Sequence, residues 1–407
     1  MLDAPAPDAA DAPRIRFWAV PHLTGLDFDP LLAELLHEDP VTRIRLPHGD
    51  GHAWLVTRYE DVRFVSADPR FSRRAARGRP VTRVAPRPVP LEGDVGFADP
   101  PDHTRMRRVL ARAFGPGPLR TLRDRAQEAM DRLLDRVEDH GAPADLVELV
   151  HRPFPLAVAG ALMGVPEGDR PLLAHWAATA VSADAGRRAG ERARADAVRY
   201  FTELVGRSHG SGRETLAAVL ADAVDDGALT GREAAGLAFL VLTGGTRAVR
   251  NNTAHMVYAL LTHPEHLARL RAEPALLPRA VDELLRYIPH RDAVGLPRIA
   301  LEDVEVGGVV IPAGDPVYVS HLTANRDPAV FPEPDRLDFD RDRAPHLAFG
   351  HGPHACPGAA LARIESEVLV ASLWDRFPDL RLAVPAERLR WQRGTSVRGP
   401  ETLPVTW

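Results

Sequence analysis

The chain has 407 residues, a hydrophobic share of 45%, a net charge of −5 and a single cysteine. The negative charge argues against nucleic acid as a general partner. No run of about eighteen uncharged apolar residues occurs, so no membrane span is expected. A lone cysteine excludes a disulfide and a four-thiolate metal site. Together with a first segment that lacks a secretory signal, it predicts a cytoplasmic location.

The N-terminal part of the chain begins with a segment unsuited to folding. Residues 1–14 are rich in alanine, proline and aspartate, which predicts a disordered tail ahead of a single domain over 15–407. Two β-like segments follow over 41–46 and 53–57, separated by a glycine-containing turn. The proline-rich segment 80–99 predicts a long irregular loop, a type of segment that usually serves function.

Helical patterns dominate the middle of the chain. Shorter helices are predicted over 102–114, 117–138, 148–163, 167–183 and 187–206. A longer helix over 230–261 is apolar on all sides in its first half, which is typical of a helix through the centre of a large protein. The pair Gly244-Gly245 predicts a break in this helix.

The remaining part of the chain mixes helix and strand. A further helix carries Glu283 and Arg286, which share a face because they are three residues apart and can therefore pair. The stretch 298–319 alternates apolar and polar residues between glycine turns and predicts strands. The last segment, 381–407, predicts short strands and turns.

The chemistry of the chain centres on Cys356, which lies in Phe-Gly-His-Gly-Pro-His-Ala-Cys-Pro-Gly over 349–358. The glycines and prolines predict a tight loop whose backbone approaches another group closely. A helical run begins after it, so the helix end and the loop amides would stabilise a thiolate. Three interpretations stay open: a buried core cysteine, a nucleophile, or a single-thiolate metal ligand. A zinc site of this cysteine with His346, His351 and His354 has poor tetrahedral spread.

This loop resembles the haem-ligand loop of the cytochrome P450 family, Phe-Gly-x-Gly-x-His-x-Cys-x-Gly, at every fixed position. The resemblance covers nearly the whole chain and implies a mainly α-helical domain with a small β-rich lobe. It also implies haem b between the central helix and the loop, with Cys356 as the iron ligand; thiolate ligation favours O–O cleavage. In this resemblance, the loop residues that contact the haem are Phe349, Gly350, His354, Cys356 and Gly358, with Phe349 covering the sulfur.

Other motifs extend the resemblance. His103 and Arg107, four residues apart, match the family's contacts to the haem propionates, and Arg298 matches a further propionate arginine. Glu283 and Arg286 match a structural pair that Arg336 would complete. The neighbouring arginines 105, 108 and 112 are interpreted as a solvated basic face, able to receive an acidic electron-donor protein.

The central helix departs from the family pattern. Where the family has an acid and an alcohol that relay protons during dioxygen activation, this chain has Arg247 and Ala248, preceded by Thr246. Arginine stays charged and alanine has no proton to give. Three hypotheses follow: substrate or water supplies the relay, the enzyme performs one-electron oxidation such as radical coupling, or it uses peroxide. Arg247 either holds a substrate carboxylate or carbonyl, or turns away to pair with a neighbouring helix.

The expected activity is oxidative tailoring of a small-molecule secondary metabolite. Hydroxylation is the common case in the family; coupling of an aromatic or cyclic-dipeptide-like substrate, peroxide-driven oxidation and a non-catalytic haem sensor are the alternatives. Because the chain has no flavin, iron–sulfur or NAD-binding motif, electrons would come from NAD(P)H through a reductase and a ferredoxin. By carry-over from the family, the substrate pocket is lined by Val84, Pro88, Val89, Thr243, Arg247, Ala248, Val294, Leu296, Ser396 and Val397.

Overall fold

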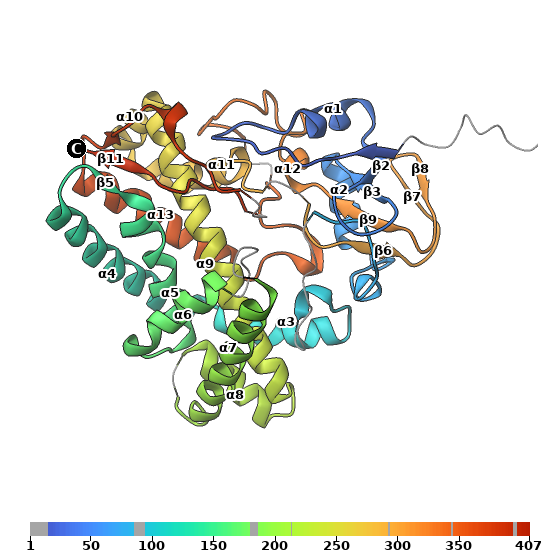
Figure 1. Cartoon of the computed structure of the whole chain (residues 1–407), viewed down its shortest axis with the longest axis horizontal. Helices are drawn as coiled ribbons and strands as arrows, with labels where there is room; N and C mark the ends of the chain where they lie inside the picture. Colours follow the sequence, from blue (N-terminus) through green and yellow to red (C-terminus); the bar gives the residue numbers. More distant parts are fainter. Residues whose placement is uncertain are drawn as a thin grey trace, which may run out of the picture.

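The structure is a computed structural model that describes residues 15–84, 94–179, 186–212, 214–291, 294–342, 345–393 and 397–407. Most helices gather on one side of the molecule and the main sheet lies on the other (Figure 1). The helices are α1 (Pro30–Glu38), α2 (Tyr59–Ala67), α3 (Asp102–Ala113), α4 (Pro116–His140), α5 (Pro153–Met163), α6 (Arg170–Thr179), α7 (Arg187–Arg207), α8 (Leu216–Asp225), α9 (Gly231–Thr262), α10 (Pro264–Ala272), α11 (Leu277–Tyr287), α12 (His321–Ala324) and α13 (Ala359–Arg376). This arrangement confirms a mainly α-helical domain with a small β-rich lobe.

The β-rich lobe is built on a six-stranded sheet of order β1-β2-β3-β9-β6-β4. The pairing of β2 with β3 is antiparallel, as their short connection requires, whereas β3 and β9 are parallel. Both β-like segments of the first part of the chain are strands of this sheet. The strands are β1 (Ile15–Phe17), β2 (Val41–Arg45), β3 (Ala53–Val56), β4 (Phe71–Ser72), β5 (Ala144–Asp145), β6 (Arg298–Ala300), β7 (Val304–Val306), β8 (Val309–Ile311), β9 (Pro316–Val319), β10 (Arg381–Leu382) and β11 (Pro404–Thr406).

Helix α9 runs through the middle of the molecule (Figure 1). Its start is fixed by a capping box, in which the Thr230 hydroxyl accepts from the Glu233 amide and the Glu233 carboxylate accepts from the Thr230 amide. The predicted break at Gly244 and Gly245 is wrong, because the helix continues through both residues. Two glycines cost about 2 kcal/mol of helix propensity, and packing of α9 against α5, α7 and α13 outweighs that cost.

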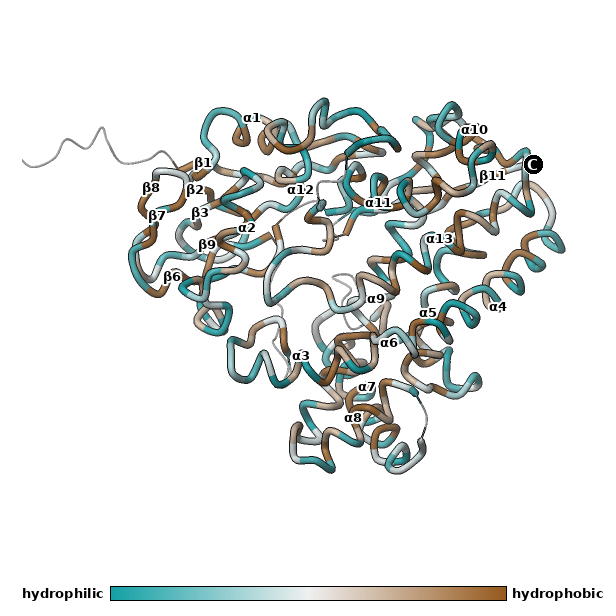
Figure 2. The backbone as a smooth tube through the Cα atoms, turned by 180° about the vertical axis from the view of Figure 1, so that it is seen from behind, coloured by the Kyte–Doolittle hydropathy of each residue, from teal (hydrophilic) through white to brown (hydrophobic). Residues whose placement is uncertain are grey.

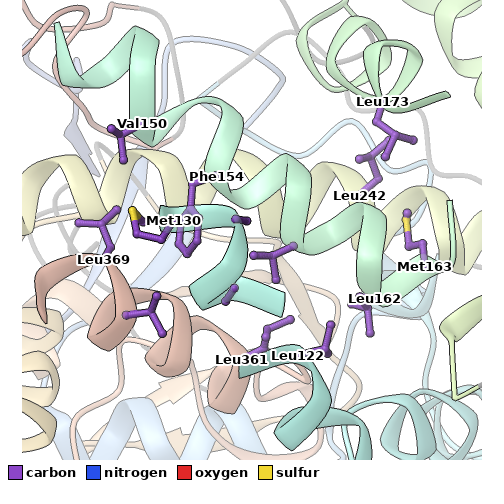
Figure 3. Packing of buried hydrophobic residues seen from close by; sticks show 14 of the residues in the cluster. Leu122, Met130, Val150, Phe154, Leu162, Met163, Leu173, Leu242, Leu361 and Leu369 are labelled. Carbon is purple, nitrogen blue, oxygen red and sulfur yellow. The ribbon is translucent and has the colours of Figure 1, made fainter. Parts of the chain in front are cut away.

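The main core lies between the long helices. Phe154 of α5, Met130 of α4 and Leu369 of α13 point toward one another (Figure 3) and are each fully buried. Hydrophobic stretches of the chain concentrate on the inward-facing turns of these helices, and hydrophilic stretches lie outside (Figure 2). In the described ranges, no helix combines the length and apolarity needed to span a bilayer.

Some helix boundaries differ from the sequence predictions. The predicted helix over 148–163 is divided into a π-helical turn, Val147–His151, and α5, which begins at Pro153. Proline has no amide hydrogen, so it suits the first turn of a helix and ends the preceding hydrogen-bond pattern. Helices α8 and α10 were not predicted from the sequence. The start of α8 does carry a local signal, because the side chain of Thr215 caps this helix.

Candidate functional site

The loop around Cys356 is held by its own backbone. The Cys356 amide donates to the Phe349 carbonyl at 2.8 Å, and the Gly350 amide donates to the Leu347 carbonyl at 2.9 Å. Gly350 has a φ of 76°, and a side chain at Gly352 would come within 2.8 Å of the Ser66 carbonyl oxygen. The backbone conformation therefore favours glycine at position 350, and the close approach of the Ser66 carbonyl favours glycine at position 352.

The electrostatics of Cys356 combine burial with nearby positive charge. Although this cysteine has an exposed surface, chain atoms surround it densely, and burial is the largest effect, raising the pKa of its thiol. The Gly358 amide, just before α13, and the guanidinium groups of Arg107, Arg291 and Arg363 oppose that rise. Coordination to a metal ion deprotonates a thiol outright, so these donors would stabilise a bound thiolate.

The residues expected to contact propionates lie near one another. The rings of His103 and His354 are 4.2 Å apart between centroids. Burial and, to a smaller extent, the positive charges of Arg73, Arg298 and Arg107 lower the pKa of His354 to about 2, so this imidazole is neutral. Arg298 is 2% exposed, and burial holds the pKa of its guanidinium well below the ordinary value.

Three further cationic or imidazole groups belong to this cluster and were missed by sequence reasoning. Arg73 follows β4 directly, and His321 begins α12, separated from the end of β9 by one residue. Arg291 has exposed surface, yet chain atoms surround its guanidinium so closely that burial lowers its pKa. No motif marked Arg73 and His321, because the pairing of β4, β6 and β9 brings them together from distant parts of the chain.

This cluster fits a group that carries two carboxylates. Within the described residues, four of its buried nitrogen atoms have no hydrogen-bond partner: Arg298 Nη1, His103 Nε2, His321 Nε2 and Arg73 Nε. Buried donors without acceptors are costly, since each loses its hydration without replacement. The two propionates of a haem would supply acceptors here while Cys356 faces the iron, so the residues present fit the cofactor that the sequence implies.

The central helix offers few groups for proton transfer. The Thr246 hydroxyl donates to the Leu242 carbonyl of the same helix at 2.7 Å, and Thr243 makes a similar bond to Phe239 at 3.0 Å. Arg247 is half-buried, and burial lowers the pKa of its guanidinium. Across the parts of the chain that the structure describes, this guanidinium has neither an ion-pair nor a hydrogen-bond partner.

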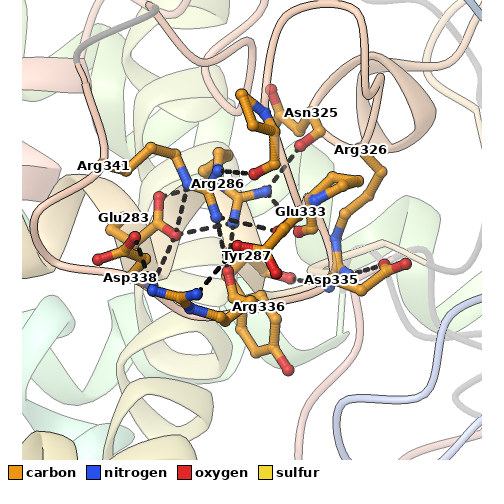
Figure 4. A network of polar contacts seen from close by, with 12 residues as sticks. Glu283, Arg286, Tyr287, Asn325, Arg326, Glu333, Asp335, Arg336, Asp338 and Arg341 are labelled. Carbon is orange, nitrogen blue, oxygen red and sulfur yellow. Dashed lines mark hydrogen bonds and ion pairs between the residues drawn. The ribbon is translucent and has the colours of Figure 1, made fainter.

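A buried polar network positions the segment that leads to the cysteine loop (Figure 4). Arg286 donates twice to Glu283 at 2.7 Å and also to the carbonyls of Asn325 and Pro334 at 2.9 Å. The prediction that Arg336 completes this pair is wrong for its side chain, which is 61% exposed; only its carbonyl accepts from Arg286, at 3.2 Å.

Arg341 takes the place predicted for that side chain. It is 9% exposed and donates to Glu283 at 3.1 Å. It also donates to the Glu333 carbonyl at 3.1 Å and the Arg336 carbonyl at 2.8 Å. The chain bends around this buried guanidinium, which explains why a residue five positions later, and not Arg336 itself, closes the network.

The expected pocket residues fall into separate groups. Val84 and Val294 pack against one apolar cluster around Trp18, and Leu296 packs against another around Phe97. Val397 is buried, and its carbonyl accepts from Asn251 of α9 at 2.9 Å. Three of the predicted lining residues lie outside the described residues: Pro88, Val89 and Ser396.

Two alternative interpretations lose support from the geometry. Among residues that the structure describes, no three histidine, cysteine, aspartate or glutamate side chains gather as a metal site, and His346 instead faces Asp282 at 3.4 Å. The proposed basic face is largely neutralised, because Arg105 binds Glu233 at 2.6 Å and Arg112 faces Asp222 at 3.4 Å. Arg108 remains exposed on α3.

Comparison with known proteins agrees with this geometry. The chain is 51% identical to a biflaviolin synthase of Streptomyces coelicolor, over 97% of both chains, and 46% identical to a nocardicin C N-oxygenase of Nocardia uniformis, over 94% of this chain and 96% of that one. The crystal structure of a cytochrome P450 with biaryl coupling reactivity superposes with a TM-score of 0.92 at 46% identity, covering 97% of this chain and all of the other. The sequence pattern of the cytochrome P450 family matches residues 207–381. The chain therefore belongs to the cytochrome P450 family.

Proposed function

We propose that this protein oxidatively couples small phenolic secondary metabolites, joining two aromatic rings through a carbon–carbon bond. The observation that carries the proposal is the central helix, where Arg247 and Ala248 replace the acid and the alcohol. With the Thr246 hydroxyl bonded inside its own helix, this part of α9 has no side chain suited to deliver a proton. A phenolic substrate carries its own ionisable hydroxyls, so it suits such a helix.

The names of two relatives support this choice among the oxidations known in the family. One is a biflaviolin synthase, and the solved structure is described as having biaryl coupling reactivity. Other relatives are hydroxylases and an N-oxygenase. Oxidative tailoring of a small molecule is common to all of them, and the coupling reaction is the finer assignment that we make for this chain.

When bound, the haem supplies the oxidising power for removing one electron and one proton from each of two rings. The two rings form the new bond, and dioxygen, with two electrons from the donor and two protons from the solvent, ends as two molecules of water. A reductase and a ferredoxin-type protein would pass on electrons from NAD(P)H. Peroxide replaces dioxygen and the donor, because it already carries those electrons and protons.

Arg247 is assigned to substrate binding. A guanidinium without an acceptor is costly once it leaves water, and a phenolate or quinone oxygen provides the missing acceptor. Gly244, three residues before it and on the same face of the helix, leaves open space: a Cβ at this position would meet no atom within 4 Å. Arg247 would therefore orient a flat ring system beside Gly244.

The reaction is tested with haem-loaded enzyme, a set of phenols and naphthols, and either a ferredoxin with its reductase or hydrogen peroxide. Mass spectrometry should detect a product of two monomers less two hydrogens. A product of one monomer plus one oxygen would replace coupling by hydroxylation. Tight binding of a phenol without any product, with both oxidants, would instead indicate a haem sensor.

The substrate role of Arg247 is tested separately by Arg247→Ala. Loss of a charge-assisted hydrogen bond should weaken binding of the coupled phenol about tenfold or more, measured from the spectral shift on titration. The matched control is Arg250→Ala, which removes another half-buried guanidinium one turn further along α9, near Glu148 and Asp145. Unchanged affinity in Arg247→Ala would contradict the assignment.

A further inference from the structure

The groups that fit the haem propionates come from two distant parts of the chain. Helix α3 carries His103 and Arg107. The antiparallel pair β4–β6 carries the others: Arg298 begins β6, and Arg73 follows β4 directly. The haem propionates can accept hydrogen bonds from α3 and from the β4–β6 pair only if the start of α3 keeps a fixed distance from these strands.

Asp99 connects the two halves. Its carboxylate accepts from the Ser72 hydroxyl at 2.5 Å and from the Arg73 amide at 3.1 Å. Its carbonyl accepts from the His103 amide at 2.9 Å, in the first turn of α3. Ser72 is paired with Ile299 in the register of β4 and β6, one residue after Arg298. One aspartate thus bonds to both elements at once.

Ser72 is well placed to serve as the partner of this carboxylate. It is 4% exposed, and its oxygen also accepts from the Ala75 amide at 2.9 Å. Its hydroxyl hydrogen is therefore directed to Asp99 while its lone pair caps the short helix that follows. Two donors from β4 and its end, one from a side chain and one from the backbone, fix the orientation of the carboxylate.

We propose that Asp99 is a positioning residue that locks α3 and the β4–β6 pair at the spacing at which their side chains bind the haem propionates, with Ser72 as its partner. The proposal rests on haem binding by this family member and adds a residue that touches neither the iron nor the reacting atoms. It also brings a negative charge close to the site. Asp99 acts against the lowering of the pKa of Arg298 and of His103.

The two effects of Asp99 can be separated by substitution. Asp99→Ala removes the charge and both acceptor oxygens, whereas Asp99→Asn keeps one acceptor oxygen and removes the charge. Ser72→Ala leaves the charge in place and removes one donor to Asp99, together with the acceptor of the Ala75 amide. A negative charge near the haem favours ferric over ferrous iron, so both changes at Asp99 should raise the midpoint potential, and Ser72→Ala should leave it unchanged.

Haem retention is measured as the rate of transfer to an excess of apomyoglobin, alongside the midpoint potential and the far-ultraviolet circular dichroism. Haem loss should become about tenfold faster or more in Asp99→Ala, and severalfold faster in Ser72→Ala, as expected for losing charged and single hydrogen bonds. Asp99→Asn should lie between wild type and Asp99→Ala. If Asp99→Ala does not fold, the other two variants carry the test.

The matched control is Asp102→Asn, three residues along, where the carboxylate makes a half-exposed ion pair with Arg74. Exposed pairs contribute little, so haem loss and potential should stay close to wild type. Wild-type rates of haem loss in Asp99→Ala and Ser72→Ala, or an unchanged potential in Asp99→Asn, would overturn the role of Asp99 alone. A wild-type protein that takes up no haem would overturn the proposed function as well.

Discussion

Removing the Arg341 side chain should destabilise the protein far more than removing the nearby Arg336 side chain. Arg341 is 9% exposed, and its loss breaks the bond to Glu283 at 3.1 Å. It also leaves three carbonyls without this donor: those of Pro332, Glu333 and Arg336. With one charged and three carbonyl hydrogen bonds lost from a mostly buried site, Arg341→Ala should cost about 3–5 kcal/mol.

Arg336→Ala is the matched comparison, because it removes the same side chain from the same segment. That guanidinium is 61% exposed and pairs with Glu333 at 2.9 Å and Asp338 at 3.3 Å. Exposed ion pairs contribute about 0–1 kcal/mol, and the carbonyl that accepts from Arg286 is unaffected. Only the position in the network differs between the two variants.

The assay is urea unfolding of haem-loaded wild type and both variants, followed by circular dichroism and analysed as shifts of the midpoint at a common slope. The midpoint should fall clearly in Arg341→Ala and stay near wild type in Arg336→Ala. Equal losses, or a larger loss in Arg336→Ala, would refute the reasoning that the buried guanidinium and not the exposed one closes the network around Glu283.

Two further outcomes are expected. Glu365 of α13 is 4% exposed, and burial raises its pKa to about 8 from an ordinary value of 4.5. Between these pH values the folded state keeps the Glu365 proton while the unfolded state releases it, so the free energy of unfolding should fall by about 1.4 kcal/mol per pH unit. Urea midpoints measured across this pH range should fall less steeply in Glu365→Gln than in wild type. Parallel pH curves for the two proteins would contradict this expectation. A Cβ at Gly399 would lie 2.5 Å from Asn251 Cγ, so Gly399→Ala should lower the thermal midpoint by overpacking equivalent to about 1–3 kcal/mol. Gly206→Ala, on an exposed turn of α7 with no atom within 4 Å, should raise it slightly; a rise in both would refute the contact.

Expectations based on short stretches of sequence agreed with the structure where the cause is local. The strands near residues 41–46 and 53–57 are present, as is the helix after Cys356, because alternation and helix propensity act between close neighbours. The break expected at Gly244 and Gly245 is absent, since packing of α9 on three other helices overrides the propensity of two residues.

The sequence by itself determined the cysteine loop, with its glycines and its position before a helix, because these features depend on a dozen consecutive residues. Only the tertiary structure decided that Arg73 and His321 lie in the propionate cluster, that Arg341 replaces Arg336 beside Glu283, and that Asp99 reaches Ser72. These contacts depend on strand register and chain path, which are set by burial across the whole molecule, and no spacing along the chain records them.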